Sequence, residues 1–256
     1  FLTIAAKNIF GASDRTEMLG IVPSSQTISC LIVNGFDRTD GTDNTFDFIK
    51  QHGSALHAAG YSFDSASNEA VINDNISLDD YMYVDWILGE EGTATSTFTN
   101  IEQTLLESYL EKGRFLFVSG SEIGYDLVAT GDTADKEFYA NYLKADYISD
   151  NAGGIYSGDG INNSIFHEIS NITFDNGNHG TYDVDYPDGI KPIGGSEICA
   201  KYTNINYSTY GGMGIEYKGV FGNSNIVGSL LYLSIGFETI YPQSMRNLIM
   251  KEIMNH

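Results

Sequence analysis

The chain has 256 residues, of which 42% are hydrophobic and 12% aromatic, a composition typical of a globular protein rather than a disordered one. Thirteen Lys and Arg stand against 34 Asp and Glu, and the formal net charge of −21 disfavours nucleic acid as a partner and suits an acidic, secreted or cell-surface protein in a salty extracellular setting. The sequence contains no apolar run of about 18 residues, so we expect no membrane span.

The first 22 residues differ from the rest of the chain. The stretch "FLTIAAKNIFGASDRTEMLGIV" has two short β-like segments around a polar turn that contains Gly11, and it predicts a hairpin. It resembles the last two strands of a fibronectin type III domain. That resemblance implies further domains of the same chain upstream of Phe1, whereas the alternative is a simple hairpin packed on the main domain of residues 23–256.

After this segment, strand and helix patterns alternate. Continuous apolar runs predict buried strands at 28–34, 81–89 and 114–119, and helical spacing predicts helices at 45–59 and after the capping box of Thr99 and Glu102. This order is typical of an α/β protein with a doubly wound, mostly parallel, flavodoxin-like sheet. We expect the strands at 28–34, 83–88, 114–119 and 229–235 to be neighbours, with helices on both faces.

The second half of the chain has a different pattern. From about 153 to 225, Gly, Asn, Asp and Tyr alternate with short strand-like stretches, which predicts an antiparallel β extension at the edge of the sheet. A buried strand follows within 226–240, and Pro242 begins a last helix. Four residues of this helix are expected to face the core: Met245, Leu248, Ile249 and Ile253.

The stretch "FVSGSEIGYDL" (117–127) indicates an enzyme-like turn. An apolar strand runs into Gly120, and Gly124 follows four residues later, just where a helix is expected to begin. The residue midway between the two glycines is the one that such a turn exposes. This is how α/β hydrolytic enzymes present a nucleophilic Ser or Cys, but the central position holds Glu122. We therefore predict that Glu122 lies in a strained backbone conformation at the turn.

Acidic residues follow several of the predicted parallel strands. Ligands bind beyond the carboxyl ends of such strands, so these residues are expected to share one rim. Like charges that lie close together raise one another's pKa, so we expect Arg38 or a cation near Glu122, and at least one of Glu90, Glu91 and Glu238 beside it. The rim residues are Asp37, Arg38, Glu90, Glu91, Ser121, Glu122, Asp126 and Glu238.

The chain resembles the class I glutamine amidotransferase-like domain of secreted bacterial proteins labelled "xanthan lyase" or fibronectin type III domain-containing. The stretches that carry the resemblance are "NGFDR", "QHGSALHAAGYSFDSASNEAV", "DYMYVDWILGEE", "LLESYLEKGRFLFVSGSEIGYDL" and "GFETI". The amidotransferase chemistry does not carry over, because the elbow Cys is replaced by Glu122. The histidine that should precede a glutamate near the last strand is also missing from "GFETI".

Several roles for Glu122 remain open. The helix N-terminus could stabilise its carboxylate, or it could form an acid/base pair with Glu90 or Glu91, oriented by Arg38. Calcium could bind through Glu122, Glu90 and Asp37, or Glu122 could form a salt bridge with Arg38 as a structural remnant. The residues considered as ligand-binding are Asp37, Ser121, Asp126, Glu238 and, because the resemblance includes "QHG", His52.

Two functions follow from these alternatives. The first is a non-catalytic binding or adhesion module of a secreted or cell-surface multidomain bacterial protein. The second is a hydrolase-like or lyase-like enzyme that acts on an extracellular polysaccharide or cell-wall polymer. In both, an extracellular glycan or cell-wall polymer is the expected partner, and aromatic residues such as Trp86 could support carbohydrate binding. Whether Cys30 and Cys199 form a disulfide stays open, since the sequence does not show that they are close.

Overall fold

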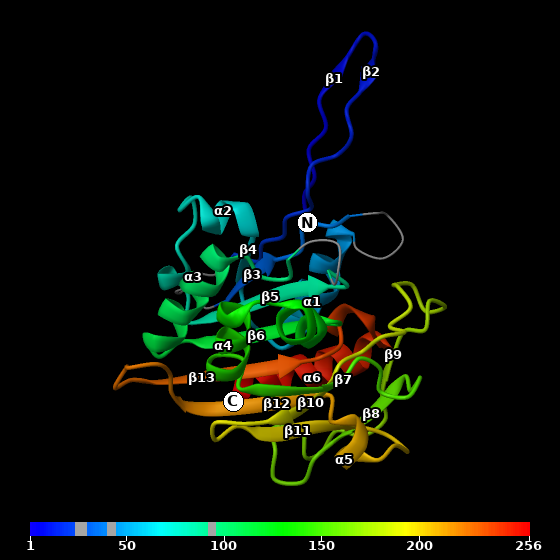
Figure 1. Ribbon diagram of the computed structural model, residues 1–256. Helices are drawn as coiled ribbons and strands as arrows, with labels where there is room; N and C mark the ends of the chain where they lie inside the picture. The colour runs from blue at the N-terminus through cyan, green and yellow to red at the C-terminus, as the bar shows by residue number, and fades with distance from the viewer. Residues whose placement is uncertain (24–29, 40–44, 92–95) are drawn as a thin grey trace.

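The computed structural model describes residues 1–23, 30–39, 45–91 and 96–256 (Figure 1). Its main feature is a ten-stranded mixed sheet with the strand order β14-β9-β8-β11-β12-β13-β6-β5-β3-β4. The strands of this sheet are β3 (Cys30–Asn34), β4 (Phe63–Ser67), β5 (Tyr83–Gly89), β6 (Phe115–Gly120), β8 (Ser157–Gly160), β9 (Ile172–Phe174), β11 (Glu197–Tyr202), β12 (Gly214–Val220), β13 (Val227–Leu233) and β14 (Ile240–Tyr241).

Five strands, β4, β3, β5, β6 and β13, form the parallel half of the sheet. β3 and β6 are buried along their whole length, as expected for strands covered on both faces. The predicted neighbours are therefore confirmed, except that residues 28 and 29 of the first strand lie outside the described residues. β4 was not predicted, because "FDSAS" carries polar residues and lies at the edge of the sheet.

The antiparallel half confirms the predicted β extension. β12 pairs antiparallel with β13, and β11, β8, β9 and β14 continue outward. One strand of this region, β10 (Gly189–Pro192), leaves the main sheet and pairs with β7 (Ala145–Ser149). The helix α5 (Tyr207–Tyr210) in the extension is a single turn.

Helices cover both faces of the parallel half (Figure 1). α1 (Ile49–Ala58) and α6 (Gln243–Asn255) pack together over one face. The opposite face packs against α2 (Asn68–Ile72), α3 (Asn100–Glu111) and α4 (Thr133–Asn141). Thr99 and Glu102 form the predicted capping box at the start of α3. The prediction for Leu248 was wrong: its side chain is 42% exposed, and α6 buries Met250 and Met254 beside the predicted Ile249 and Ile253.

The N-terminal segment is a hairpin that projects from the α/β body (Figure 1). β1 (Lys7–Asn8) and β2 (Gly11–Ala12) pair antiparallel, and the turn between them leaves Ile9 and Phe10 each 91% exposed. At its base, Glu17 accepts a hydrogen bond of 2.6 Å from the Asn34 side chain at the end of β3. β1 and β2 thus form a hairpin, whereas the division of the chain at residue 22 and the relation of this segment to fibronectin type III domains stay predictions.

Candidate functional site at the carboxyl edge of the sheet

The strand-to-helix turn after β6 has the predicted strained geometry. Glu122 has a φ of 62°, in the left-handed region that residues with a side chain rarely adopt. Its carbonyl accepts a hydrogen bond of 2.9 Å from the Asp126 N–H, which opens the helical segment Tyr125–Thr130. The positive φ lies at the position of the nucleophile in an enzyme elbow, so the turn geometry is present although the nucleophile is not.

The two flanking glycines are needed for close packing rather than for unusual dihedral angles. Gly124 has an ordinary helical φ of −73°. A Cβ atom added at Gly120 would lie 2.8 Å from Leu88 Cβ, and one at Gly124 would lie 2.7 Å from the Tyr139 hydroxyl oxygen. Both distances are too short for real atoms, so the turn can approach β5 and α4 only with glycine at these places.

Glu122 lies in an environment that disfavours its ionised form. Burial raises the pKa of its carboxyl group, and the nearby carboxylates Asp150, Asp185 and Asp126 raise it further. Arg38 opposes these effects, which supports the prediction that this arginine acts on the elbow. Of the three carboxylates, the sequence pointed only to Asp126.

The N-terminus of the helix after the elbow is occupied by another acid. The Gly124 N–H donates a hydrogen bond of 2.5 Å to Oδ2 of Asp188, a fully buried residue just before β10. Burial raises the Asp188 pKa well above its usual value, against the effect of hydrogen bonds from the Gly124 and Tyr125 N–H groups. Two N–H groups at this helix N-terminus therefore serve Asp188 and not Glu122, and the expectation that the helix N-terminus stabilises Glu122 stays a prediction.

Arg38 and its neighbours come together as predicted. The Arg38 side chain donates a hydrogen bond of 2.5 Å to the Glu90 carbonyl oxygen. The almost fully buried Glu91 carboxylate accepts hydrogen bonds of 3.2 Å from the backbone N–H groups of Asp37 and Arg38. The Asp37 side chain accepts a further bond of 2.9 Å from Asn68. These contacts hold the loop after β3 against the loop after β5.

Glu238 belongs to a buried chain of polar groups. Its Oε2 lies 3.3 Å from Nε2 of His52, and Nδ1 of His52 lies 2.8 Å from Oδ2 of Asp85. Burial by itself would lower the pKa of His52, but the two carboxylates outweigh it and raise the pKa to about 9. His52 is therefore a buried cation with both ring nitrogens engaged, and it has no free nitrogen for a ligand.

Tyr182 connects this chain to the elbow. Its hydroxyl donates a hydrogen bond of 2.7 Å to Oε1 of Glu238. Burial raises the pKa of Tyr182 well above its usual value and Glu238 adds to the effect, whereas a hydrogen bond with the Ser121 side chain opposes it. Ser121 itself is buried beside Glu122, and its N–H donates to the Gly89 carbonyl at 2.9 Å. Tyr182 and Ser121 thus link Glu238 to the elbow.

Five residues of this site were missed by sequence reasoning. They are Asp85, Asp150, Tyr182, Asp185 and Asp188. Asp85 lies inside an apolar strand run, where a single acid could have signalled a buried partner. The other four lie in the stretch from Asp150 to Asp188, where acids and tyrosines are so frequent that no pattern singles them out.

The described residues contain no group of three or more His, Cys, Asp or Glu side chains arranged to hold a metal ion. The calcium site expected at Glu122, Glu90 and Asp37 therefore gains no support from them. Cys30 and Cys199 are both buried and free. Within the part of the chain that the structure describes, no helix has the length and apolarity needed to span a bilayer.

No family model matches the sequence, and neither does any curated protein. Solved structures do resemble the fold. A ThuA-like protein from Bacteroides uniformis ATCC 8492 is 10% identical, with 89% of this chain and 91% of that chain covered at a TM-score of 0.54. Gan42B, a GH42 β-galactosidase from G. stearothermophilus, is 11% identical, with 90% of this chain covered at a TM-score of 0.54.

This chain spans only 30% of the galactosidase chain. A glutamine amidotransferase from Thermotoga maritima is 13% identical, with 84% of this chain and 77% of that chain covered at a lower TM-score of 0.47. At these identities the likenesses show the fold alone. The protein has a flavodoxin-like α/β fold that resembles the fold of a ThuA-like protein.

Proposed function

We propose that this chain is a non-catalytic binding module of a secreted or cell-surface multidomain bacterial protein. One observation carries the proposal: a carboxylate, Glu122, stands at the position where acyl-transfer enzymes of this kind need a serine or cysteine nucleophile. The N–H groups of Gly124 and Tyr125 behind it serve a second carboxylate, Asp188. An elbow without a thiol or hydroxyl nucleophile favours binding over covalent acyl transfer.

The expected ligand is an extracellular glycan or cell-wall polymer. The rim offers Arg38 as a hydrogen-bond donor and carboxylates such as Glu122 and Asp150 as acceptors, and sugar hydroxyls can pair with both. The acidic surface of the whole chain argues against nucleic acid. Further domains upstream of Phe1 and a location outside the cell belong to the same proposal.

A second candidate function is a carboxylate-dependent hydrolase. The raised pKa of Glu122, caused by burial and then by Asp150, is what a general acid needs near neutral pH. Asp150, whose own pKa is raised by burial, or Asp185 would then serve as the partner carboxylate. The hydrolase and the binding module both depend on Glu122. A single variant at this residue therefore tests both functions when polysaccharide binding and product release are measured together.

The experiment combines binding and product release. Wild type, Glu122→Gln and the control Glu137→Gln, an exposed residue of α4, are run through gels that contain bacterial and plant polysaccharides. The same mixtures are assayed for new reducing ends. We expect a polysaccharide to retard the wild type and Glu137→Gln, to retard Glu122→Gln less, and to release no reducing ends.

Release of reducing ends by the wild type that disappears in a Glu122→Gln variant melting no lower than the wild type would establish the hydrolase instead. Absence of retardation by every polysaccharide, with no reducing ends, would exclude both functions for the rim.

A further inference from the structure

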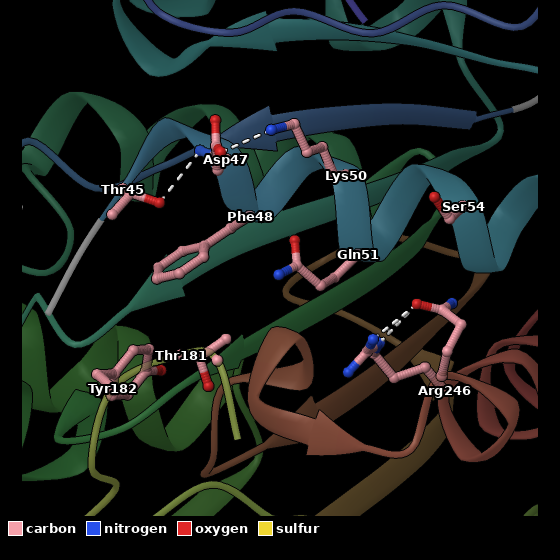
Figure 2. A pocket seen from close by; sticks show the side chains of 11 residues that line it. Thr45, Asp47, Phe48, Lys50, Gln51, Ser54, Thr181, Tyr182 and Arg246 are labelled. Atoms are coloured by element: carbon pink, nitrogen blue, oxygen red, sulfur yellow. Dashed lines mark hydrogen bonds and ion pairs between the residues drawn. The ribbon is translucent and has the colours of Figure 1, made fainter. Parts of the chain in front are cut away.

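A polar cavity of about 480 Å³ lies away from the elbow, between α1, the loop at 180–182 and the start of α6 (Figure 2). This volume falls within the range of small-molecule sites, which is about 300 to 1,000 Å³. Glu122 and Arg38 do not line it. Tyr182 connects the cavity to the buried polar groups near the elbow, because it lines the cavity and its hydroxyl group donates a hydrogen bond to Glu238.

Two cations line this cavity although the chain carries a net charge of −21. Lys50 is paired with Asp47, at 2.6 Å between Nζ and Oδ2. The Arg246 guanidinium group donates to the Gln243 side-chain oxygen at 2.6 Å and 3.2 Å and to the Ile240 carbonyl, all of them neutral acceptors. Among the described residues no carboxylate forms a salt bridge with Arg246, so the cavity holds a positive charge that an anion could neutralise.

The cavity also contains a buried acceptor. Oε1 of Gln51 is shielded from solvent and has no hydrogen-bond partner among the described residues. Figure 2 shows Gln51 directed from α1 into the space opposite Arg246. A carboxylate has no proton to offer this oxygen, whereas a hydroxyl group does, so one ligand that satisfies both Arg246 and Gln51 carries an acid and an alcohol.

Two aromatic residues also line the cavity. The rings of Phe48 and Tyr182 pack with their centroids 5.7 Å apart at one end of the cavity. The carbon face of a sugar ring packs well on such a surface. The charge of the whole chain also limits the ligand, because a monoanion is repelled less by an acidic protein than a dianion such as a phosphate monoester.

We propose that the cavity between α1 and α6 binds a sugar acid, with its carboxylate on Arg246, one hydroxyl group on Gln51 and another on Lys50. The source could be a free monosaccharide or the end of an acidic polysaccharide, since both present the same carboxylate and hydroxyl groups. This site is independent of the function proposed for the elbow rim.

Isothermal titration calorimetry with three probes tests the chemistry. Galacturonate carries the carboxylate and hydroxyl groups, galactose lacks the carboxylate, and acetate lacks the hydroxyl groups. We expect galacturonate to bind at least about tenfold more tightly than either of the other two. Trigalacturonate distinguishes the sources: tighter binding than the monosaccharide indicates a polymer end, and equal or weaker binding indicates the free acid.

Three variants test the location, with one matched control. Arg246→Gln, Lys50→Gln and Gln51→Leu are each expected to weaken galacturonate binding, by about tenfold for Arg246→Gln. Lys251→Gln, an exposed residue on the same helix as Arg246, should bind like the wild type, and so should Glu122→Gln. Thermal melts confirm that each variant is folded. If Arg246→Gln does not fold, Lys50→Gln and Gln51→Leu decide the question.

The proposal is overturned if the wild type does not bind galacturonate, or if galactose or acetate binds as well as galacturonate. It is also overturned if Lys50→Gln and Gln51→Leu, both folded, bind galacturonate as well as Lys251→Gln does. Loss of galacturonate binding in Glu122→Gln would contradict the independence of the two sites.

Discussion

Glu122 combines an unfavourable backbone conformation with an unfavourable charge environment. Its pKa in the folded protein is raised, by burial and then by Asp150, so protonation stabilises the folded state. That stabilisation is fully present below the unfolded pKa of about 4.5 and is lost as the pH rises through the raised folded value. Ionisation of this side chain as the pH rises therefore weakens the fold, as is common for residues kept for function.

Glu122→Gln should accordingly melt at a higher temperature than the wild type near neutral pH. The difference should shrink as the pH falls toward about 4, because the protonated glutamic acid then resembles glutamine. Thermal melts at both pH values measure this, with Glu137→Gln as the exposed control that should follow the wild type. A variant that is less stable than the wild type at neutral pH would show that Glu122 is a structural ion-pair partner.

His52 gives the opposite pH dependence. Its pKa is about 9 in the folded protein, since Asp85 and Glu238 outweigh the effect of burial, against 6.5 for an ordinary histidine. The stabilisation from its positive charge is fully present below about pH 6.5 and is lost as the pH rises through about 9. We expect the wild type to lose stability over this range.

His52→Gln should lower the free energy of unfolding by about 3 to 5 kcal/mol, because two buried carboxylates lose their cation. It should also remove the fall in stability between neutral and alkaline pH. Urea unfolding at several pH values measures both effects, and His57→Gln, an exposed residue of the same helix, is the matched control. A His52 variant with the pH profile of the wild type would mean that the imidazole is neutral in the folded protein.

At the scale of single elements, the elbow turn depends on a glycine that touches α4. A methyl group at Gly124 would lie 2.7 Å from the Tyr139 hydroxyl and 2.8 Å from the Tyr147 ring. Gly124→Ala should therefore destabilise the protein by about 1 to 3 kcal/mol. Adding Tyr139→Phe removes the nearest atom and should recover part of the loss in a double-mutant cycle. Strictly additive effects of the two substitutions would contradict the close approach.

The elements differed in how far the sequence could predict them. "TISCLIVN" and "RFLFVSG" have long apolar runs, and only a strand covered on both faces explains them, so the centre of the sheet was predictable. Edge strand β4 was not, because its sequence "FDSAS" is largely polar and matches a loop equally well. Leu248 was assigned to the core by helical spacing, but the buried stripe of α6 runs through Met250 and Met254 instead.

The residues of the candidate site also differed in how far the sequence could predict them. The spacing of Gly120, Glu122 and Gly124 predicted the elbow, because few other turns need that combination. Asp188 could not be found, since its role comes from a tertiary contact with the Gly124 N–H across a long stretch of chain. Its burial is visible only in the folded structure.

For the whole molecule, the net charge of −21 sets the response to salt. Repulsion among surface carboxylates weakens the folded state, and it is screened when the Debye length falls from about 30 Å at low salt to a few Å near molar salt. The melting temperature should therefore rise as sodium chloride is added at neutral pH. The rise should be smaller near pH 4, where many carboxylates are protonated, and a melting temperature that falls with salt would contradict this account.

β13 joins the two halves of the sheet, with β6 parallel on one side and β12 antiparallel on the other. It follows β6 and β12 in the chain, so during synthesis both of these strands have emerged before the strand that joins them exists. Until then β6 presents an unpaired apolar edge, which is a template for pairing with other chains. The nascent protein therefore depends on β13 to cover this edge, and the long separation of β6 and β13 in the sequence favours slow folding.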